Sequence, residues 1–216
     1  MTWDDLSFWD SGEWQVIEEH LDYLDKNKLL YNPKREKLFA ALDLVDYEDV
    51  KVVIVGQDPY PKAKHATGIA FSIPKGEKEI PPTLVNIFRE YGSDLHYDAP
   101  QSGDLTPWCK EGVLLWNTCP LYLPNSQNAY SDEWELLNRE MFQKLSQEAI
   151  VFVLLGAKAH RLEEYIDGKS KAIKTSHPSP LGAFKSTSPF MGSRIFTTTN
   201  TKLRELGYSP VDWNLK

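Results

Sequence analysis

Four short hydrophobic runs divide a largely polar chain, at residues 52–55, 113–116, 150–155 and 172–175. The first three are almost continuously aliphatic or β-branched, and the fourth is interrupted by a lysine. Strands that are buried on both faces of a parallel sheet show such near-continuous runs. We therefore expect a strand at each of these positions.

Hydrophobic residues at helical spacing occupy the intervals between the runs. The clearest helix is expected at 132–147, where Trp134, Leu137, Met141 and Leu145 share one face. Acidic residues at its start suit the positive end of a helix dipole. Further helices are expected near residues 12–29, 34–43, 83–91, 157–166 and 193–206.

Two helices followed by alternating strands and helices predict an α/β fold. We expect a three-layer α/β/α arrangement around a central four-stranded, mainly parallel sheet. The sequence has no internal repeat and no Gly/Ser linker, so residues 1–216 are expected to form one domain.

Polar residues follow the expected strands where binding sites form in open parallel sheets, at the carboxyl ends. Gly-Gln-Asp-Pro-Tyr occupies 56–60, Asn117 follows the second strand, Gly156 the third, and Ser-His-Pro-Ser-Pro-Leu occupies 176–181. Proline and glycine stiffen these loops. The pattern predicts a preorganised polar site at one rim of the sheet.

The formal net charge of −7 is unevenly distributed along the 216 residues. Residues 1–50 contain 13 acidic and 5 basic residues, whereas residues 169–204 contain seven basic residues and no acidic one. Because salt screens electrostatic fields beyond about 8–10 Å, a basic stretch can face phosphate even on an acidic protein. Charge alone fits this interpretation and a solvated surface that balances the acidic N-terminal region equally well.

Composition excludes several classes of protein. Hydrophobic residues make up 41% and charged residues 25% of the chain, as in an ordinary folded protein. The two cysteines, Cys109 and Cys119, are too few for a four-thiolate metal site, and we expect reduced, structural thiols. With no apolar segment of about 18 residues and no signal-peptide pattern at the start, we expect a soluble cytoplasmic protein without membrane contact, metal or cofactor.

Two strand-end loops carry a family resemblance. Residues 56–60 and the His-Pro-Ser-Pro-Leu run at 177–181 together resemble the signature loops of family-1 uracil-DNA glycosylases. Between them, residues 68–72, 81–84 and 108–117 resemble that family in the same order. The resemblance covers about residues 30–207. It implies hydrolysis of the bond between uracil and deoxyribose after the nucleotide is flipped out of DNA, which leaves an abasic site.

The resemblance implies how the bond would be cleaved. Asp58 orients the attacking water and faces the sugar cation, and His177 donates a hydrogen bond to uracil O2 as a neutral imidazole. Backbone N–H groups near Gln57 add to this oxyanion site. The structural alternatives are a turn or helix-cap residue for Asp58 and a partly buried, hydrogen-bonded histidine for His177.

Base recognition is implied for three residues. Asn117 presents one amide to the N3–H and O4 of uracil, Phe71 stacks on the base, and Tyr60 excludes the thymine methyl group sterically. Without the resemblance, an Asn after a strand is often a turn residue and a lone Phe is usually part of the core.

DNA contacts are implied on two loops. Leu181 is expected to be an apolar wedge that occupies the opening left by the flipped nucleotide, rather than a leucine folded back onto the core. The residues expected to grip or face the DNA backbone are Pro82, Thr83, Ser179, Lys185 and Arg194.

Several positions depart from the family pattern. Pro61 and Thr67 each stand where His is common, Gly182 stands where Ser is usual, and the family's Ser-His pair is not evident in residues 125–131. Because these positions concern DNA gripping and loop conformation, we expect retained chemistry with weakened or altered backbone binding. The alternatives for the missing contact are Lys62, Lys64 or Tyr130.

We therefore expect a monofunctional glycosylase that initiates base-excision repair on uracil-containing single- or double-stranded DNA and releases free uracil. A proteinaceous inhibitor and replication proteins are further expected partners. One alternative is a non-catalytic DNA-binding scaffold of the same fold, which the presence of both polar loops disfavours. Another is a metal-dependent phosphoesterase built on Asp58 and His177, which the lack of further ligands at suitable spacing disfavours.

Overall fold

The four hydrophobic runs form one parallel sheet in the computed structural model, which describes residues 2–124, 126 and 131–215. The strands are β1 (Val52–Gly56), β2 (Val113–Asn117), β3 (Val151–Leu155) and β4 (Lys171–Thr175). Their order across the sheet is β2-β1-β3-β4, and every neighbouring pair is parallel. The first three strands are buried throughout, whereas β4 is a partly exposed edge strand, which explains its weaker hydrophobic pattern.

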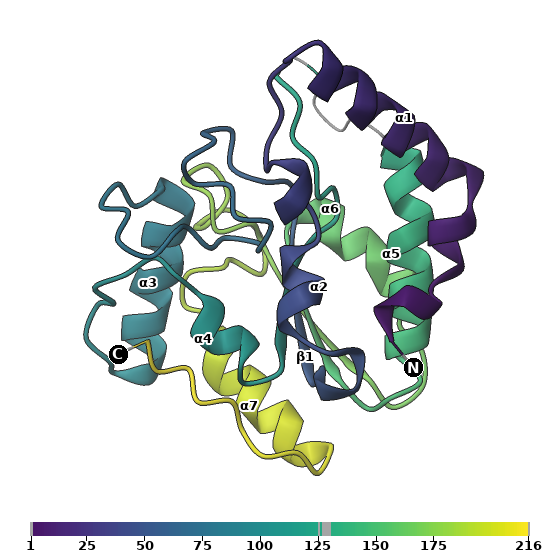
Figure 1. Ribbon diagram of the computed structural model, residues 1–216. Helices are drawn as coiled ribbons and strands as arrows, with labels where there is room; N and C mark the ends of the chain where they lie inside the picture. The colour runs from purple at the N-terminus through teal and green to yellow at the C-terminus, as the bar shows by residue number, and fades with distance from the viewer. Residues whose placement is uncertain (1, 125, 127–130, 216) are drawn as a thin grey trace.

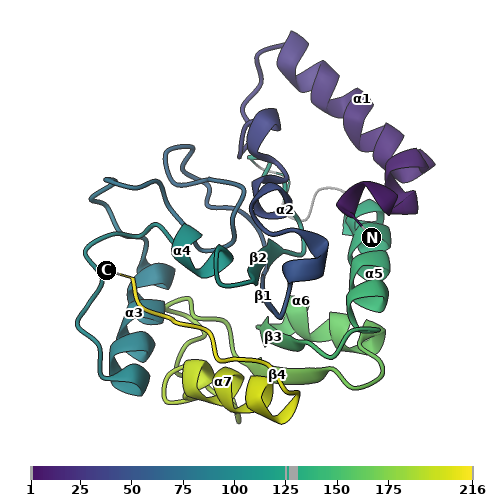
Figure 2. The same cartoon turned by 60° about the horizontal axis from the view of Figure 1, so that its bottom comes forward.

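Helices cover both faces of the sheet, as the sequence predicts. Helices α3 and α7 lie on one side, and α1 and α5 lie on the other (Figure 1, Figure 2). The α-helices are α1 (Gly12–Lys26), α2 (Ala40–Leu44), α3 (Pro82–Leu95), α4 (Thr106–Cys109), α5 (Ser131–Leu145), α6 (Ala157–His160) and α7 (Ile195–Glu205). The 3-10 helices are η1 (Trp3–Asp5), η2 (Ser7–Asp10), η3 (Arg35–Lys37), η4 (Tyr47–Asp49) and η5 (Arg161–Tyr165).

Two of the expected helices are interrupted. The segment 34–43 consists of η3 followed by α2, and the non-helical dihedrals of Phe39 (φ −113°, ψ 21°) separate them. The segment 157–166 is α6 followed directly by η5. Hydrophobic spacing cannot separate an α-helix from a 3-10 helix over one or two turns, because the two periods diverge too little. For the same reason the four-residue α4 has no detectable pattern.

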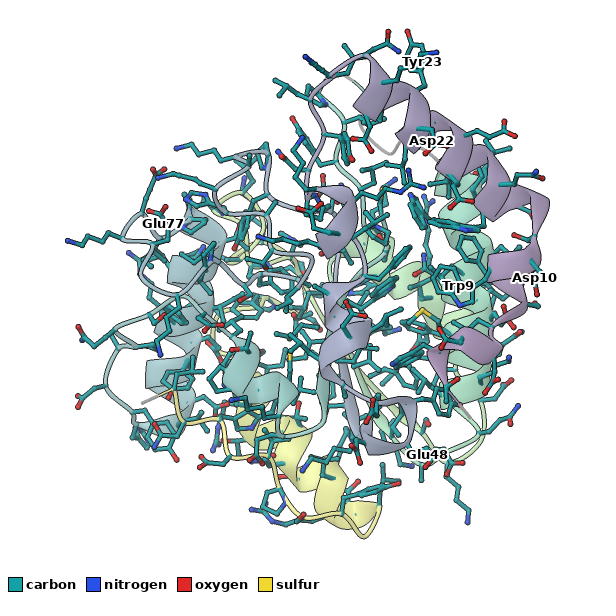
Figure 3. The ribbon with its side chains drawn as sticks, viewed as in Figure 1. Trp9, Asp10, Asp22, Tyr23, Glu48 and Glu77 are labelled. Atoms are coloured by element: carbon teal, nitrogen blue, oxygen red, sulfur yellow. The ribbon has the colours of Figure 1, made fainter. Side chains whose placement is uncertain are left out.

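The N-terminal segment packs through aromatic side chains. The ring of Phe8 lies 6.0 Å from the ring of Trp134 on α5, and Trp9 lies 4.9 Å from Phe39. Trp9 and the neighbouring Asp10 are labelled in Figure 3. Helix α1 begins here because Ser11 accepts a hydrogen bond from the Trp14 N–H and caps the first turn. None of the helices among the described residues is long and apolar enough to span a membrane.

Candidate functional site

The carboxyl ends of the strands converge on one pocket. Gly56 and Asn117 are partners in register at the ends of β1 and β2, Asp58 follows two residues after β1, and His177 follows two residues after β4. Asp58, Asn117 and His177 all line a pocket of about 340 Å³. Other predicted site residues in its wall are Tyr60, Phe71 and Thr83.

A glycine at the end of β1 allows this convergence. A Cβ atom at Gly56 would lie 2.6 Å from the Oδ1 of Asn117 and 2.9 Å from the ring of Phe71, so no larger residue fits. Phe71 itself has a φ of 65°, which is unusual for an aromatic residue and costs backbone strain. The Tyr60 hydroxyl donates a hydrogen bond of 2.9 Å to the Phe71 carbonyl and helps to hold this conformation.

The Asn117 amide is available to a ligand. The residue is buried, with an exposed fraction of 8%, and it lines the pocket. No hydrogen bond joins its side chain to another residue within the described part of the chain. Because buried amides rarely lack partners, the amide is placed to pair with a pocket occupant.

The protonation state of His177 follows from its surroundings. Burial lowers its pKa to about 4, so the ring is neutral at pH 7. The Ser179 N–H donates to its Nδ1 at 3.1 Å, which leaves the proton of the neutral ring on Nε2. Gly156 brings the ring close to β3, since a Cβ there would lie 2.9 Å from the Cβ of His177. His177 is therefore a neutral imidazole whose Nε2–H can donate a hydrogen bond.

Asp58 lies at the exposed rim of the pocket. Partial burial raises its pKa above the usual value, and the positive charge of Lys158 opposes this shift. Lys158 belongs to α6, directly after β3. A lysine early in a short helix has no distinctive pattern, so the sequence does not indicate its proximity to Asp58.

The loop after His177 presents two exposed apolar side chains. Leu181 has an exposed fraction of 80% and Phe184 one of 67%, whereas Ala183 between them is fully buried. The N–H groups of Gly182 and Ala183 both donate to the Ser179 carbonyl and close a tight turn. The expectation of an exposed Leu181 is thus met, and Phe184 is an exposed neighbour that the sequence did not identify.

The same loop explains the glycine at position 182. A Cβ atom there would lie 2.7 Å from the His177 carbonyl oxygen. The turn therefore packs against the His177 backbone more closely than a serine would allow.

Three buried polar residues on α3 hold the segments after β4. The Asn86 amide donates to the Pro178 carbonyl at 2.9 Å. The Glu90 carboxylate accepts from the N–H groups of Gly192 and Arg194 at 2.6 and 2.7 Å. Asp94 accepts from the backbone and side chain of Thr197 at the start of α7. Spaced four residues apart, they form one polar stripe, Asn86–Glu90–Asp94, beneath the functional loops.

The remaining predicted residues lie outside the pocket wall. The Gln57 carbonyl accepts from the Cys119 N–H and the Thr118 hydroxyl, which ties the ends of β1 and β2 together. Arg194 is exposed, with its Nε 3.6 Å from Asp94. Exposed or half-buried positions are also taken by Pro82, Ser179 and Lys185.

Two alternatives for the contact missing at Pro61 are already paired. Lys62 forms a salt bridge with Glu79, and Lys64 bridges Glu77 at 3.3 Å and Glu79 at 2.8 Å. These lysines, chiefly Lys62, lower the pKa of Glu79 to about 2. Figure 3 labels Glu77 on this loop, which precedes α3. The third alternative, Tyr130, lies outside the described residues.

The described residues of the site do not form a metal-binding cluster. No group of three or more histidine, cysteine or acidic side chains gathers there to hold an ion. Cys109 and Cys119 are buried thiols that are not joined in a disulfide, and burial raises their pKa values to about 12 and about 11. Both thiols are therefore unreactive at neutral pH.

Comparison with known proteins gives one consistent family. The model of the uracil DNA glycosylase superfamily matches residues 42–204. The chain is 39% identical over 208 residues to a uracil-DNA glycosylase of Enterococcus faecalis, covering 94% of this chain and 89% of that protein. It is 36% identical over 205 residues to one of Campylobacter jejuni, covering 93% and 86%.

Solved structures agree with the sequence relatives. The mimivirus uracil-DNA glycosylase superposes with a TM-score of 0.85 at 26% identity, over 94% of this chain and 82% of that chain. A variant of the mimivirus protein in complex with UGI superposes with a TM-score of 0.80 at 26% identity, over 94% and 88%.

Proposed function

The chain belongs to the uracil-DNA glycosylase superfamily, and we propose from this premise that it is a uracil-DNA glycosylase of the family-1 type. It hydrolyses the N-glycosidic bond of a flipped deoxyuridine and leaves an abasic site. The observation that carries the proposal is the meeting of Asp58, Asn117 and His177 in one pocket. Residues 56–60 and 177–181, the loops of the family-1 resemblance, supply two of the three.

Uracil recognition rests on a buried, unpaired amide. The side chain of Asn117 can donate to O4 of uracil and accept from N3–H at the same time. Cytosine presents an amino group and an unprotonated N3 at these positions, so both interactions become repulsive or are lost. A bidentate contact of this kind discriminates by about 1–3 kcal/mol, and burial adds the cost of unpaired groups.

Thymine is excluded by shape. It differs from uracil by one methyl group, which no hydrogen bond detects and which an apolar pocket distinguishes by only about 1–3 kcal/mol. A ring against carbon 5 of the base acts instead by steric clash. Tyr60 has this role, and its hydrogen bond to the Phe71 carbonyl restrains the ring from moving aside. Phe71 provides the stacking surface for the base.

Bond cleavage separates charge, and the pocket has a group for each side. The Asp58 carboxylate orients the attacking water and stabilises the cationic sugar. At about 4 Å and an effective dielectric of about 20, one charge stabilises another by about 4 kcal/mol, or about three orders of magnitude in rate. His177, neutral and protonated on Nε2, donates to O2 of the departing uracil anion. A neutral donor suits this site because a cation would require a second proton on a buried ring, which desolvation disfavours.

DNA is held outside the pocket. Leu181 enters the base stack as a wedge, and Thr83 and Ser179 contact the backbone together with Pro82. Lys185 and Arg194 attract the phosphates. The mimivirus structure with UGI supports a protein inhibitor of that kind as a partner of this chain, and replication proteins are a further proposed partner.

Release of uracil from DNA tests the proposal. A labelled oligonucleotide with one deoxyuridine is incubated with the protein in EDTA, and abasic sites are revealed by alkaline cleavage. We expect release from uracil-containing DNA, none from matched thymine or cytosine substrates, and a large loss in Asp58→Asn. An intact substrate after long incubation would leave the DNA-binding scaffold as the better account.

A further inference from the structure

One buried imidazole in the pocket wall has no role in the mechanism above. His65 lines the pocket and has an exposed fraction of only 3%. Its Nε2 atom is buried and lacks a hydrogen-bond partner among the residues that the structure describes. Buried polar atoms in proteins are nearly always paired, and leaving one unpaired is unfavourable. The observation points to a partner that arrives with the substrate.

The ring is positioned by its own segment. The His65 N–H donates to the Lys62 carbonyl at 2.9 Å, which closes a turn just after the Asp58 loop. The imidazole packs edge-on against Tyr60, with ring centroids 5.9 Å apart. His65 is thus next to the residue that faces the base, and it reaches the pocket from the segment that follows the catalytic loop.

The chemistry of the flipped nucleotide narrows the choice of partner. The uracil edge is taken by Asn117 and His177, and the sugar by Asp58. The hydrogen-bonding atoms that remain on the nucleotide and its neighbours are mainly phosphodiester oxygens, which accept strongly from imidazole N–H groups.

The neighbouring basic side chains are already engaged. Lys62 and Lys64 are paired with Glu79 and Glu77, and Pro61 has no donor. The pKa of Glu77 is lowered first by the Glu79 N–H and also by Lys64 and His65, so the imidazole and this carboxylate are electrostatic neighbours. Within residues 61–65, the ring Nε2 of His65 is therefore a side-chain nitrogen without a partner among the described residues.

We propose that His65 is a further substrate-contact residue, whose ring donates a hydrogen bond to a phosphodiester oxygen adjacent to the flipped nucleotide. This proposal rests on the glycosylase function above. The contact requires the ring to turn about the Cβ–Cγ bond, which exchanges nitrogen and carbon positions, because Nε2 is buried in this structure. The contact supplies the backbone interaction that Pro61 cannot make.

Neutral phosphates provide a direct test. Single-stranded substrates carry one deoxyuridine and, in turn, an uncharged methylphosphonate at each of the neighbouring phosphate positions. Each substrate is assayed with the parent protein, His65→Phe, which keeps a ring without nitrogen, and His65→Gln, which keeps a donor. His20→Phe on α1 is the matched control. Circular dichroism verifies that each variant is folded.

We expect His65→Phe to lower kcat/KM on the all-phosphate substrate about tenfold, the loss of one good hydrogen bond, and His65→Gln to recover part of it. At one phosphate position, methylphosphonate should slow the parent about tenfold but leave His65→Phe nearly unchanged, because the contact is already gone.

Additive losses at every phosphate position, or full activity of His65→Phe, would overturn the phosphate contact and leave His65 as a packing residue. If His65→Phe does not fold, the same comparison is made with His65→Leu, which also removes the ring nitrogens. Failure of the parent protein to release uracil would instead refute the glycosylase function, so the two proposals fail separately.

Discussion

At the scale of single residues, the pocket combines side chains that are fixed by their neighbours with side chains that are left unpaired. Tyr60 and His177 have hydrogen-bond partners that set their orientation. The Asn117 amide and the His65 ring are buried without such partners among the described residues. Fixed groups exclude wrong substrates, whereas unpaired groups gain most when the right one binds.

Asn117→Asp tests the base-reading amide. A protonated or reoriented carboxyl group can pair with the N3 and amino group of cytosine, which the amide cannot do in the orientation that reads uracil. We expect uracil release to fall about ten- to hundredfold, consistent with the loss of a bidentate contact, and cytosine release to become measurable. Asn200→Asp, on α7, is the control and should keep strict uracil preference. The same strictness in Asn117→Asp would show that another residue reads the base.

We predict that Lys158 extends the activity to lower pH. In the proposed mechanism Asp58 must be ionised; burial raises its pKa, and the charge of Lys158 lowers it. Lys158→Met therefore raises the pKa of Asp58, so kcat/KM should be lost at a higher pH on the acid side, with the smallest change at pH 8. The pH profile of kcat/KM measures this.

A conservative substitution separates the charge of Lys158 from its packing. Lys158→Arg should restore the parent profile, and Lys174→Met, which removes an exposed lysine of β4 that pairs with Glu163, should not shift it. A uniform loss of activity at all pH values in Lys158→Met would mean that this residue does not act through Asp58.

Residues that directly follow a strand could be predicted from the sequence. Residues that matter because the fold brings them next to another side chain could not. Asp58, Asn117 and His177 each follow a hydrophobic run, so parallel topology alone brings them to one rim. Lys158 and His65 act through neighbours that are distant in sequence or buried by the fold. Neither has a local signal.

At the scale of secondary structure, burial on both faces made the strands predictable, while short helices escaped prediction. The register of β1 with β2 places Gly56 beside Asn117, which no periodicity reveals. Helix α3 also differs from expectation, since it extends to Leu95 and includes the buried polar residues Glu90 and Asp94. Their carboxylates accept hydrogen bonds from the segments after β4 and do not stabilise the helix itself.

The polar stripe of α3 predicts that DNA binding and catalysis depend on the same hydrogen bond, between Asn86 and the loop after β4. Asn86 lies one turn into the helix, after Thr83 at the pocket, and donates to the Pro178 carbonyl between His177 and Ser179. Asn86→Ala leaves this buried carbonyl unpaired, at a cost of about 1–3 kcal/mol. We expect kcat to fall about tenfold on single-stranded DNA and further on duplex DNA, where the proposed wedge Leu181 of the same loop would also be needed.

A remote amide provides the matched control for Asn86→Ala. Asn200 on α7 forms two hydrogen bonds with the backbone of Val211, at 3.0 and 2.9 Å, so Asn200→Ala should lower stability without lowering kcat. Chemical denaturation and single-turnover kinetics measure the two effects. Equal stability losses with equal, unchanged kcat values would assign Asn86 a purely structural role.

At the scale of the whole molecule, salt bridges change the interpretation of the uneven charge along the chain. The acidic α1 region holds its own cation, since Arg35 pairs with Glu18 and Asp22. The exposed Lys185 and Arg194 lie on segments next to the wedge loop, so a net charge of −7 does not prevent a local positive field. Charge counting cannot separate these two residues from Lys169 and Lys171, which lie at the opposite end of β4 from His177.

The functional pocket also makes the stability of the whole protein depend on pH. The pKa of His177 is lowered by burial from 6.5 to about 4 in the folded state. Between these values the unfolded chain binds a proton that the folded chain does not, so protonation favours unfolding as pH falls. The contribution of His177 to folding is therefore complete above pH 6.5 and declines toward pH 4, by at most about 3 kcal/mol.

Substitution of His177 isolates its contribution to the pH dependence of the unfolding free energy. His177→Asn keeps a polar side chain but removes the titrating group, so its unfolding free energy should fall less than that of the parent between pH 6.5 and 4. Asp58 acts in the opposite direction, because its raised pKa favours the folded state on acidification, and it is present in both proteins. Urea unfolding at several pH values measures the difference between the two curves. Curves that stay parallel from pH 8 to 4 would show that His177 titrates alike in both states, and the neutral Nε2 donor assigned to the mechanism would then lose its basis at acid pH.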